Sequence, residues 1–305
     1  MTKYALKRIL VGLVTIFILA TIVFVLMKTL PGGPFDSDRE TDPRVRAILE
    51  AHYNLDKPVL TQYRLYLQDV LQGNLGESFK KSGITVTDMI VRLSPTTMRL
   101  GGVALLFALT MGITLGIISA LTKKQWVKGL IVIFATVGVS IPGFLLALFL
   151  IFLFTVRLGW LPTIGLSTWK HYIMPALALS FYPIAFISRM TRSTLNEVTR
   201  QDYIIMARSK GISPIAVLLK HAMKNTLIPV VTYLGPLIAN LMTGSFVVET
   251  RFAIPGIGRE FVESITGRDY PVIMGLTVFL GTFIVAMNLL SDLAIALVDP
   301  RIRLQ

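Results

Sequence analysis

The chain has 305 residues, of which 53% are hydrophobic, and its mean hydropathy is +0.69. A soluble domain of this length is not normally so apolar, and the composition therefore predicts an integral membrane protein. The formal net charge of +13 does not indicate a nucleic-acid partner, because the cations lie in short loops between apolar runs, where they set topology. Cysteine is absent and the three histidines are scattered, so we expect no disulfide, no thiolate nucleophile and no metal site.

The N-terminal segment, residues 1–34, is predicted to be a cytoplasmic tail and a first transmembrane helix. Ile9–Leu30 is apolar and follows the basic residues of Met1–Arg8. The run is longer than the apolar region of a signal peptide, and no small-residue cleavage site follows it. Residues 31–34, with the sequence PGGP, are expected to stop the helix.

Residues 35–94 are polar and nearly balanced in charge, and two stretches within them have helical periodicity. The first runs from Val45 to His52 and the second from Leu60 to Leu71, where Gly73 closes it. We expect this segment to form a small helical subdomain on the extracellular face, because loops longer than about 60 residues are translocated whatever their charge.

Five further apolar runs give six spans in total and an all-α, polytopic membrane protein. They are Thr96–Leu121, Gly129–Val156, Ile173–Phe186, Leu227–Val248 and Val272–Val298, the third of these being expected to continue past Arg189. The cations outside the long loop fall on alternate connections and on both ends of the chain. By the positive-inside rule we expect both termini and the loop 192–226 to be cytoplasmic. Residues 95–298 are then the membrane core, which includes this loop, and residues 299–305 are a cytoplasmic tail.

Polar and helix-breaking residues inside the spans mark a candidate transport path. Ser140–Gly143 interrupts the third span, which indicates either a broken helix beside a path or a packing kink. Thr232, Pro236, Asn240 and Thr243 form one stripe at helical spacing, which suits a water-filled path or hydrogen bonding between helices equally well. The candidate path-lining residues are Pro142, Thr232, Asn240 and Thr243.

Two smaller features concern charge and helix packing within the spans. Asn288 and Asp292 lie one turn apart in the last span. Because Asp292 is near the cytoplasmic end, we expect it to cap the helix or to form an ion pair rather than to act at the midplane. Gly112 and Gly116 form a small-xxx-small pair that is typical of close helix packing.

The cytoplasmic loop is predicted to contain two short amphipathic helices. In the first, Tyr203, Met206, Ala207 and Lys210 follow i, i+3, i+4, i+7 spacing, and Gly211 suits the left-handed residue that closes a helix. Ser213 and Pro214 are typical of the start of a second helix, whose stripe is predicted to be Ile215, Leu218, Leu219 and Ala222. Such helices either lie in the headgroup layer or form a docking surface for a cytoplasmic partner, and the periodicity does not distinguish the two.

The chain lacks the motifs of an enzyme or of a self-contained pump. It has no GxxxxGK followed by Ser or Thr, no HExxH, no GxSxG and no carboxylate pair inside a span, so we expect no catalytic residues. The sequence GIG at 256–258 has no third glycine in the position of a nucleotide fingerprint. An ion-driven carrier would place several ionisable groups near the midplane, so energy for transport is expected to come from another subunit. A standalone secondary carrier and a membrane-embedded hydrolase are the alternatives.

Several blocks of sequence resemble the integral-membrane permeases of binding-protein-dependent ABC importers. They are TLPGGPF, NLDKPVLTQYRLYL, GNLGESF, ARSKGISPIAVLLKHAMKNTLIPVV, TGSFVVETRFAIPGIG, GRDYPVIMGLT and VDPRIR. Their order and spacing are similar to those of the oligopeptide/dipeptide/nickel branch, and in particular to its OppB-type permeases. The signature loop of the family has the form E-A-A-x-x-x-G. Ala207 and Gly211 match it, whereas Ile205 and Met206 stand where the glutamate and the first alanine would be.

The resemblance implies a type I ABC importer permease fold, in the bacterial cell (inner) membrane, that takes up oligopeptides. A dipeptide or nickel importer of the same branch is the alternative. Besides the lipid bilayer, it further implies three kinds of protein partner: a homologous second permease, two cytoplasmic ATPases that bind Mg-ATP, and an extracellular or periplasmic peptide-binding protein. No cofactor is expected in this chain. The residues that the resemblance assigns to the ATPase-coupling loop are Asp202, Tyr203, Met206, Ala207, Lys210, Gly211, Ser213, Pro214 and His221.

Overall fold

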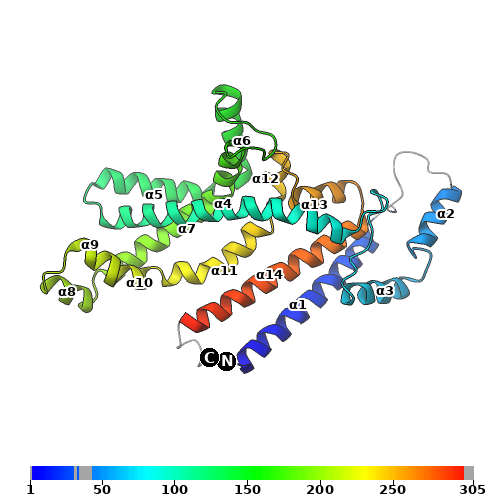
Figure 1. The fold of residues 1–305 in the computed structure, drawn as a ribbon, viewed down its shortest axis with the longest axis horizontal. Coiled ribbons are helices and arrows are strands. Elements are labelled where there is room, and N and C mark those ends of the chain that lie inside the picture. Colours follow the sequence, from blue (N-terminus) through cyan, green and yellow to red (C-terminus); the bar gives the residue numbers. More distant parts are fainter. Residues whose placement is uncertain (1, 31–32, 34–42, 299–305) are drawn as a thin grey trace.

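The computed structural model describes residues 2–30, 33 and 43–298, and this part of the chain is built from helices joined by loops (Figure 1). Five helical stretches are long and apolar enough to cross a membrane, and there are six if one bent helix pair counts as a span, in agreement with the six predicted runs. Four of these stretches are the single helices α1 (Thr2–Thr29), α4 (Val86–Leu121), α7 (Lys170–Val198) and α14 (Tyr270–Val298). The other, Ile228–Arg251, consists of α11 (Ile228–Met242) and α12 (Phe246–Arg251). The bent pair is α5 (Gln125–Ser140) with α6 (Gly143–Leu150), which continues into the π-helical η1 (Ile151–Arg157).

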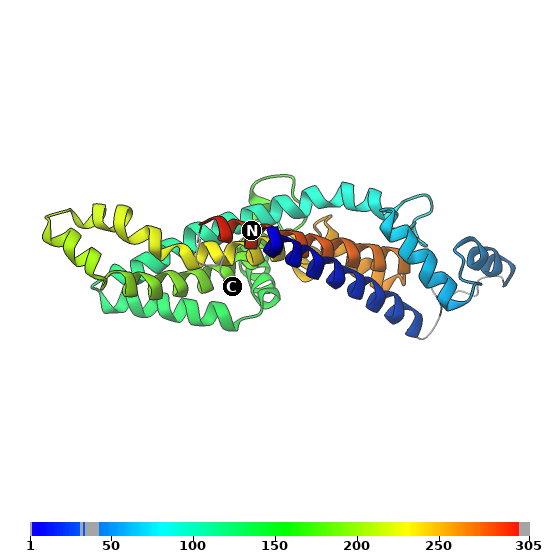
Figure 2. The ribbon, with the colours of Figure 1, turned by 90° about the horizontal axis from the view of Figure 1, so that it is seen from below.

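The shorter helices gather at the two ends of this bundle. One end carries α8 (Asp202–Ser209), α9 (Pro214–Ala216), the π-helical η2 (Val217–Ala222) and α10 (Met223–Thr226). The other end carries α2 (Pro43–His52), α3 (Val59–Leu71) and α13 (Ile257–Thr266), whereas α12 (Phe246–Arg251) lies nearer the middle, beside α6 (Figure 1). The predicted outer subdomain and the predicted coupling loop therefore lie at opposite ends of the long helices (Figures 1 and 2). Residues 31, 32, 34 and the predicted tail 299–305 lie outside the described part of the chain.

Helices α4 and α7 form the centre of the bundle because small residues let their backbones approach closely. A Cβ added at Gly112 would lie 2.9 Å from the Cβ of Ile187, and one added at Gly116 would lie 2.6 Å from the Cβ of Thr191. The predicted packing role of this glycine pair is confirmed. Around it the main apolar core collects buried side chains from α4, α6, α7, α11 and α12.

Helix α1 packs along α14 as an additional span beside the core (Figure 2). A side chain at Gly12 would meet Val285 Cγ1 at 2.7 Å, so the two helices are in close contact there. Near their adjacent ends, Arg8 Nη1 lies 3.2 Å from Asp292 Oδ2. This ion pair confirms the structural role predicted for Asp292.

The predicted interruption of the third span at Ser140–Gly143 is confirmed, because α5 and α6 meet at 110° around Pro142, and α6 points away from the bundle (Figure 1). Two other segments differ from the predicted spans. The predicted run Leu227–Val248 is divided into two helices. Gly244 has a φ of 84° and lies in the break between the end of α11 and the start of α12. Helix α4 begins at Val86, ten residues before the predicted run, because Thr85 and Asp88 form a capping box that starts the helix within the polar segment.

Candidate functional site

The predicted coupling loop folds into a two-helix elbow, defined here as residues 202–226, at one end of the bundle (Figure 1). Helix α8 closes at Gly211, whose φ is 76°. The Gly211 N–H donates to the Arg208 carbonyl at 3.0 Å, and the Ile212 N–H donates to the Ala207 carbonyl at 3.4 Å. This is the Schellman arrangement that satisfies the last carbonyls of a helix, and it confirms the closing residue predicted from the sequence.

The second half of the elbow begins as predicted and then changes register. Ser213 Oγ accepts a hydrogen bond from the Ala216 N–H at 3.4 Å, and Pro214 occupies the first helical position. The chain then forms a π-helical turn, η2, in which residues five apart share a face. Val217 and Ala222 are consequently buried, whereas Ile215 and Leu219, which the predicted stripe included, are 71% and 64% exposed.

A small apolar cluster joins the elbow to the bundle and determines which face of α8 is free. We call it the elbow cluster; its buried members are Leu195, Val198, Ile204, Ala207, Val217 and Ala222. Because Ala207 is in this cluster, the predicted common surface of Tyr203, Met206 and Ala207 is wrong. The exposed side of α8 instead carries Tyr203, Ile205 and Met206.

The remaining residues assigned to the loop lie on the elbow's surface or bridge its two halves. Asp202 and Lys210 are exposed at the two ends of α8, and His221 is half-buried in η2. The Asn225 side-chain amide donates a hydrogen bond to the Tyr203 hydroxyl at 2.7 Å, which ties α8 to α10. The elbow is therefore a fixed unit, held by two caps, one apolar cluster and one side-chain hydrogen bond.

Two of the four predicted path residues lie together in a cleft between α11 and α14. This α11–α14 cleft has a volume of about 400 Å³. Its lining is Pro236, Ala239, Asn240, Thr243, Gly244, Phe246, Leu280, Ile284 and Asn288. Thr232 is exposed on α11 and is not part of this lining, and Pro142 is exposed at the bend between α5 and α6, also outside it.

Beside the cleft, a buried carboxylate that sequence reasoning missed fastens three helices together. Glu249 of α12 is fully buried; its Oε1 accepts from the Thr97 hydroxyl at 3.1 Å and its Oε2 accepts from the Arg259 N–H at 3.1 Å. Thr97 in turn accepts from the Ile257 N–H at 2.9 Å. The carboxylate therefore satisfies the first turn of α13 and links it to α4.

Glycines make room for this carboxylate. A Cβ at Gly244 or Gly256 would overlap an oxygen of Glu249, and one at Gly258 would lie 3.0 Å from Oε2. We call this enclosure the glycine chamber. A signal for it was present in the sequence, since an acid inside an apolar run precedes the PGIG segment by a few residues. Only the folded chain brings Thr97 to it.

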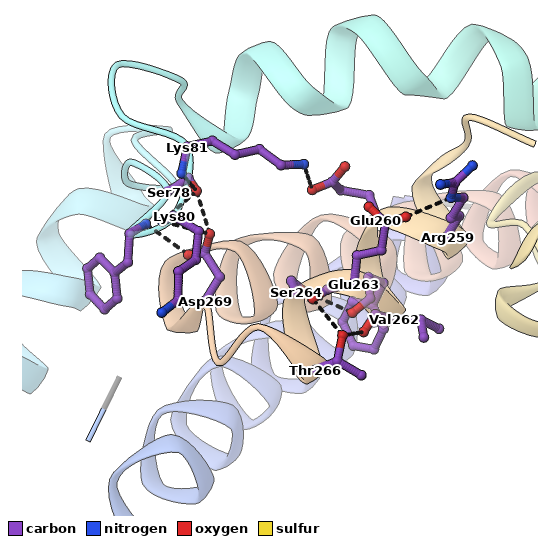
Figure 3. A network of polar contacts seen from close by, with 12 residues as sticks. Ser78, Lys80, Lys81, Arg259, Glu260, Val262, Glu263, Ser264, Thr266 and Asp269 are labelled. Atoms are coloured by element: carbon purple, nitrogen blue, oxygen red, sulfur yellow. Dashed lines mark hydrogen bonds and ion pairs between the residues drawn. The ribbon is translucent and has the colours of Figure 1, made fainter. Parts of the chain in front are cut away.

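A second polar network fixes the outer loop to the start of α14 (Figure 3). Asp269, which is 4% exposed, accepts from the Ser78 hydroxyl and from the Phe79 N–H, the latter at 3.0 Å. Lys81 forms an ion pair with Glu260 of α13. Burial, together with the negative charges of Glu77 and Asp269, raises the pKa of the nearby Tyr53 hydroxyl.

The fold and these sites define a multi-pass membrane permease, and comparison with known proteins agrees. The fold is similar to a chain of the MetNI methionine ABC transporter in its inward-facing conformation, with a TM-score of 0.57, 20% identity, and coverage of 69% of this chain and 96% of that chain. Residues 112–304 match the family of binding-protein-dependent transport system inner membrane components, and residues 1–101 match the corresponding N-terminal family. The chain belongs to this family.

Two curated relatives cover the full length. The chain is 45% identical over 304 residues to the dipeptide transport system permease protein DppB of Bacillus subtilis, covering 100% of this chain and 99% of the relative. It is 39% identical over 305 residues to the oligopeptide transport system permease protein OppB of Haemophilus influenzae, covering 99% and 100%. The resemblance inferred from the sequence blocks is thereby confirmed.

Proposed function

We propose that this chain is the permease subunit of an ABC importer for oligopeptides, and that it forms the path together with a homologous second permease. The full-length relatives that are named peptide permeases support the substrate class. The observation that carries the mechanism is the elbow: a rigid unit with an exposed apolar face, in a chain that has no phosphate-binding loop of its own. Such a chain needs a partner that binds nucleotide and pushes on that face.

In the proposed mechanism two cytoplasmic ATPases bind Mg-ATP and contact the side of α8 formed by Tyr203, Ile205 and Met206. Movement of the elbow is transmitted through the elbow cluster, because Leu195 and Val198 belong to the end of α7. Helix α7 packs on α4 and α5, so that a displacement at one end of α7 reaches the centre of the bundle.

The proposed orientation follows from the positive-inside rule. Both termini and the elbow face the cytoplasm, and the segment 35–94 faces the outside of the bacterial cell (inner) membrane, where an extracellular or periplasmic peptide-binding protein delivers its cargo. The opposite positions of the elbow and the outer segment in the bundle support this arrangement (Figure 1).

The proposal is tested by reconstitution of the assembled importer in liposomes. Uptake of a labelled oligopeptide should require the binding protein, ATP and both ATPases, and the isolated chain should transport nothing along an ion gradient. Uptake by the isolated chain would instead indicate a secondary carrier. A dipeptide importer is the second candidate, favoured by the DppB relative; a length series from two to five residues separates it from an oligopeptide importer.

A nickel importer of the same branch has less support from the site. The described lining of the α11–α14 cleft includes no histidine, cysteine or carboxylate, and these are side chains that a divalent nickel ion would favour. Competition of peptide uptake by nickel salts should therefore have no effect, whereas inhibition would favour the nickel alternative.

A further inference from the structure

Two arginines near the end of α7, Arg189 and Arg192, carry charges that no acid of the chain balances. Neither guanidinium forms an ion pair or a hydrogen bond within the described part of the chain. Residues 89–196 contain no aspartate or glutamate, and the next acid, Glu197, accepts a hydrogen bond from the Ser193 hydroxyl at 3.3 Å. Both arginines belong to a stretch that is long and apolar enough to cross a membrane, where a charge without a partner is costly.

The two arginines line a pocket between α4, α5 and α7, which we call the α5–α7 pocket. Its volume is about 210 Å³. The lining residues Ser119, Ala135 and Ser188 are buried, whereas Thr136 and Arg189 are exposed, so the pocket opens at the surface of the bundle. Because the arginines are three residues apart on one helix, they are neighbours on its surface and their charges repel. A bound anion would remove this repulsion.

The α5–α7 pocket lies toward the end of the bundle that carries the elbow. A Cβ added at Gly116 would lie 2.8 Å from the Ser188 carbonyl oxygen, and α4 ends only five residues later, at Leu121. The exposed Lys123 and Lys124 follow in the loop between α4 and α5, at the same end as the elbow (Figures 1 and 2). In the orientation that rests on the proposed function, this is the cytoplasmic end. Anionic lipids are concentrated in the cytoplasmic leaflet, and basic pockets between helices bind their headgroups.

The surface beside the pocket is apolar, which favours an amphiphile over a soluble anion. Leu130, Ile133 and Val137 of α5 are exposed, and they adjoin the part of α5 that lines the pocket. Trp126, at the start of the same helix, is also exposed, and tryptophan is enriched where a membrane meets water. A molecule with an anionic head and apolar tails matches both the arginines and this face, whereas a free phosphate matches the arginines alone.

We infer that the α5–α7 pocket binds the phosphate of an anionic phospholipid, whose acyl chains lie along the exposed face of α5. Guanidinium groups bind phosphate through charge-assisted hydrogen bonds that are often bidentate. The Thr136 hydroxyl already donates to the Val132 carbonyl at 2.9 Å, so the two arginines supply the recognition. Arg192 lies one turn before Leu195 of the elbow cluster. The lipid therefore joins α5 to the part of α7 that carries the elbow.

The first test measures lipid affinity. Phosphatidylglycerol is titrated against the assembled importer in detergent and followed by native mass spectrometry, with zwitterionic phosphatidylcholine as the comparison. The double variant Arg189→Gln/Arg192→Gln should bind phosphatidylglycerol roughly thirtyfold more weakly, about fivefold for each charge, with phosphatidylcholine unaffected. The control Arg92→Gln/Arg99→Gln removes two charges from exposed positions of α4 and should bind as the unchanged chain does. Equal binding by the first double variant, or an equal loss in the control, overturns the inference.

The second test keeps both arginines and uses the absence of cysteine from the chain. Thr136→Cys at the exposed edge of the pocket, with Trp126→Cys outside it as the control, is labelled in the assembled importer by the neutral reagent methyl methanethiosulfonate. Phosphatidylglycerol should slow labelling at position 136 severalfold relative to phosphatidylcholine and leave position 126 unchanged, and glycerol phosphate should have no effect. Equal rates in the two lipids overturn the inference. Protection by glycerol phosphate indicates a soluble anion, and absence of labelling in phosphatidylcholine indicates a covering subunit; either result overturns the lipid site.

These outcomes are distinguishable from failure of the proposed function, because neither test measures uptake. If the unchanged importer takes up no peptide in an ATP-dependent manner while lipid binding depends on the two arginines, the proposed function fails and the lipid site stands. If that importer takes up peptide and shows no preference for phosphatidylglycerol at the pocket, only the lipid site is wrong.

Discussion

Replacement of Gly211 by alanine tests the elbow most selectively. Gly211 has a φ of 76°, and a Cβ added there would meet nothing within 4 Å. Steric overlap is therefore absent, and the cost is that of a left-handed L-residue, about 1–2 kcal/mol. This is of the same order as burial of one large aliphatic side chain such as Ile204, about 1.5–3 kcal/mol. We expect the elbow to open more often without unfolding.

The opening is measured by hydrogen exchange of the amides at 211 and 212, whose hydrogen bonds to Arg208 and Ala207 close the helix. A cost of about 1–2 kcal/mol corresponds to a loss of protection of roughly fivefold to thirtyfold. In reconstituted importers, the number of peptides transported per ATP hydrolysed should fall severalfold, because a loose elbow transmits less of the movement of the ATPase.

Two further variants make the experiment specific. Gly211→Asn should recover part of the loss, since asparagine tolerates the left-handed region better than alanine does. Gly129→Ala is the matched control: Gly129 lies in α5, its added Cβ also meets nothing within 4 Å and its φ is not positive. If Gly211→Ala retained the protection of the unchanged chain, the account of the turn would be refuted. Faster exchange with an unchanged transport ratio would refute the coupling role.

Three other changes have expected outcomes that follow from the packing. Glu249→Ala leaves two buried hydrogen-bond donors unpaired in the glycine chamber, so we expect the free energy of unfolding to fall by about 3 kcal/mol or more. The loss is measured as a lower Tm of the purified importer and should be smaller for Glu249→Gln. Gly235→Ala forces α11 from α14 at a cost of about 1–3 kcal/mol, and the second change Ser291→Gly should restore the Tm; an unchanged Tm in the single variant would disprove the close contact. Tyr203→Phe removes one hydrogen bond at the surface of the elbow and should cost at most about 1 kcal/mol, so a complete loss of uptake would mean that the hydroxyl contacts a partner directly.

The local features of this protein were predictable from the sequence because their causes are local. Five stretches are long and apolar enough to cross a membrane, and the caps at Gly211 and Ser213 depend on neighbouring residues only. The close packing at Gly112 and Gly116 followed from the absence of side chains.

The features that were wrong or missed depend on residues far apart in the chain. Ala207 is buried because a π-helical turn brings Val217 and Ala222 against it. The prediction assumed the spacing of a regular α-helix, from which a π-helical turn cannot be foreseen. Glu249 was missed because its partner Thr97 comes from another helix. The Pro142 region indicated a break, but the angle of 110° is set by how α5 and α6 pack on α7.

Cross-linking from the exposed face of α8 tests most directly whether the elbow transmits the work of a partner ATPase. The variant Met206→Cys introduces a single cysteine at a side chain that is 59% exposed, and the assembled importer is treated with a short cleavable bifunctional reagent. The control is Leu71→Cys on α3, at a side chain that is 86% exposed at the opposite end of the molecule. Position 206 should cross-link to an ATPase subunit, block ATP-driven uptake and recover when the reagent is cleaved, while position 71 should form no such product. Cross-linking of the ATPase at position 71 rather than 206, or full uptake while 206 is linked, would contradict the proposed mechanism.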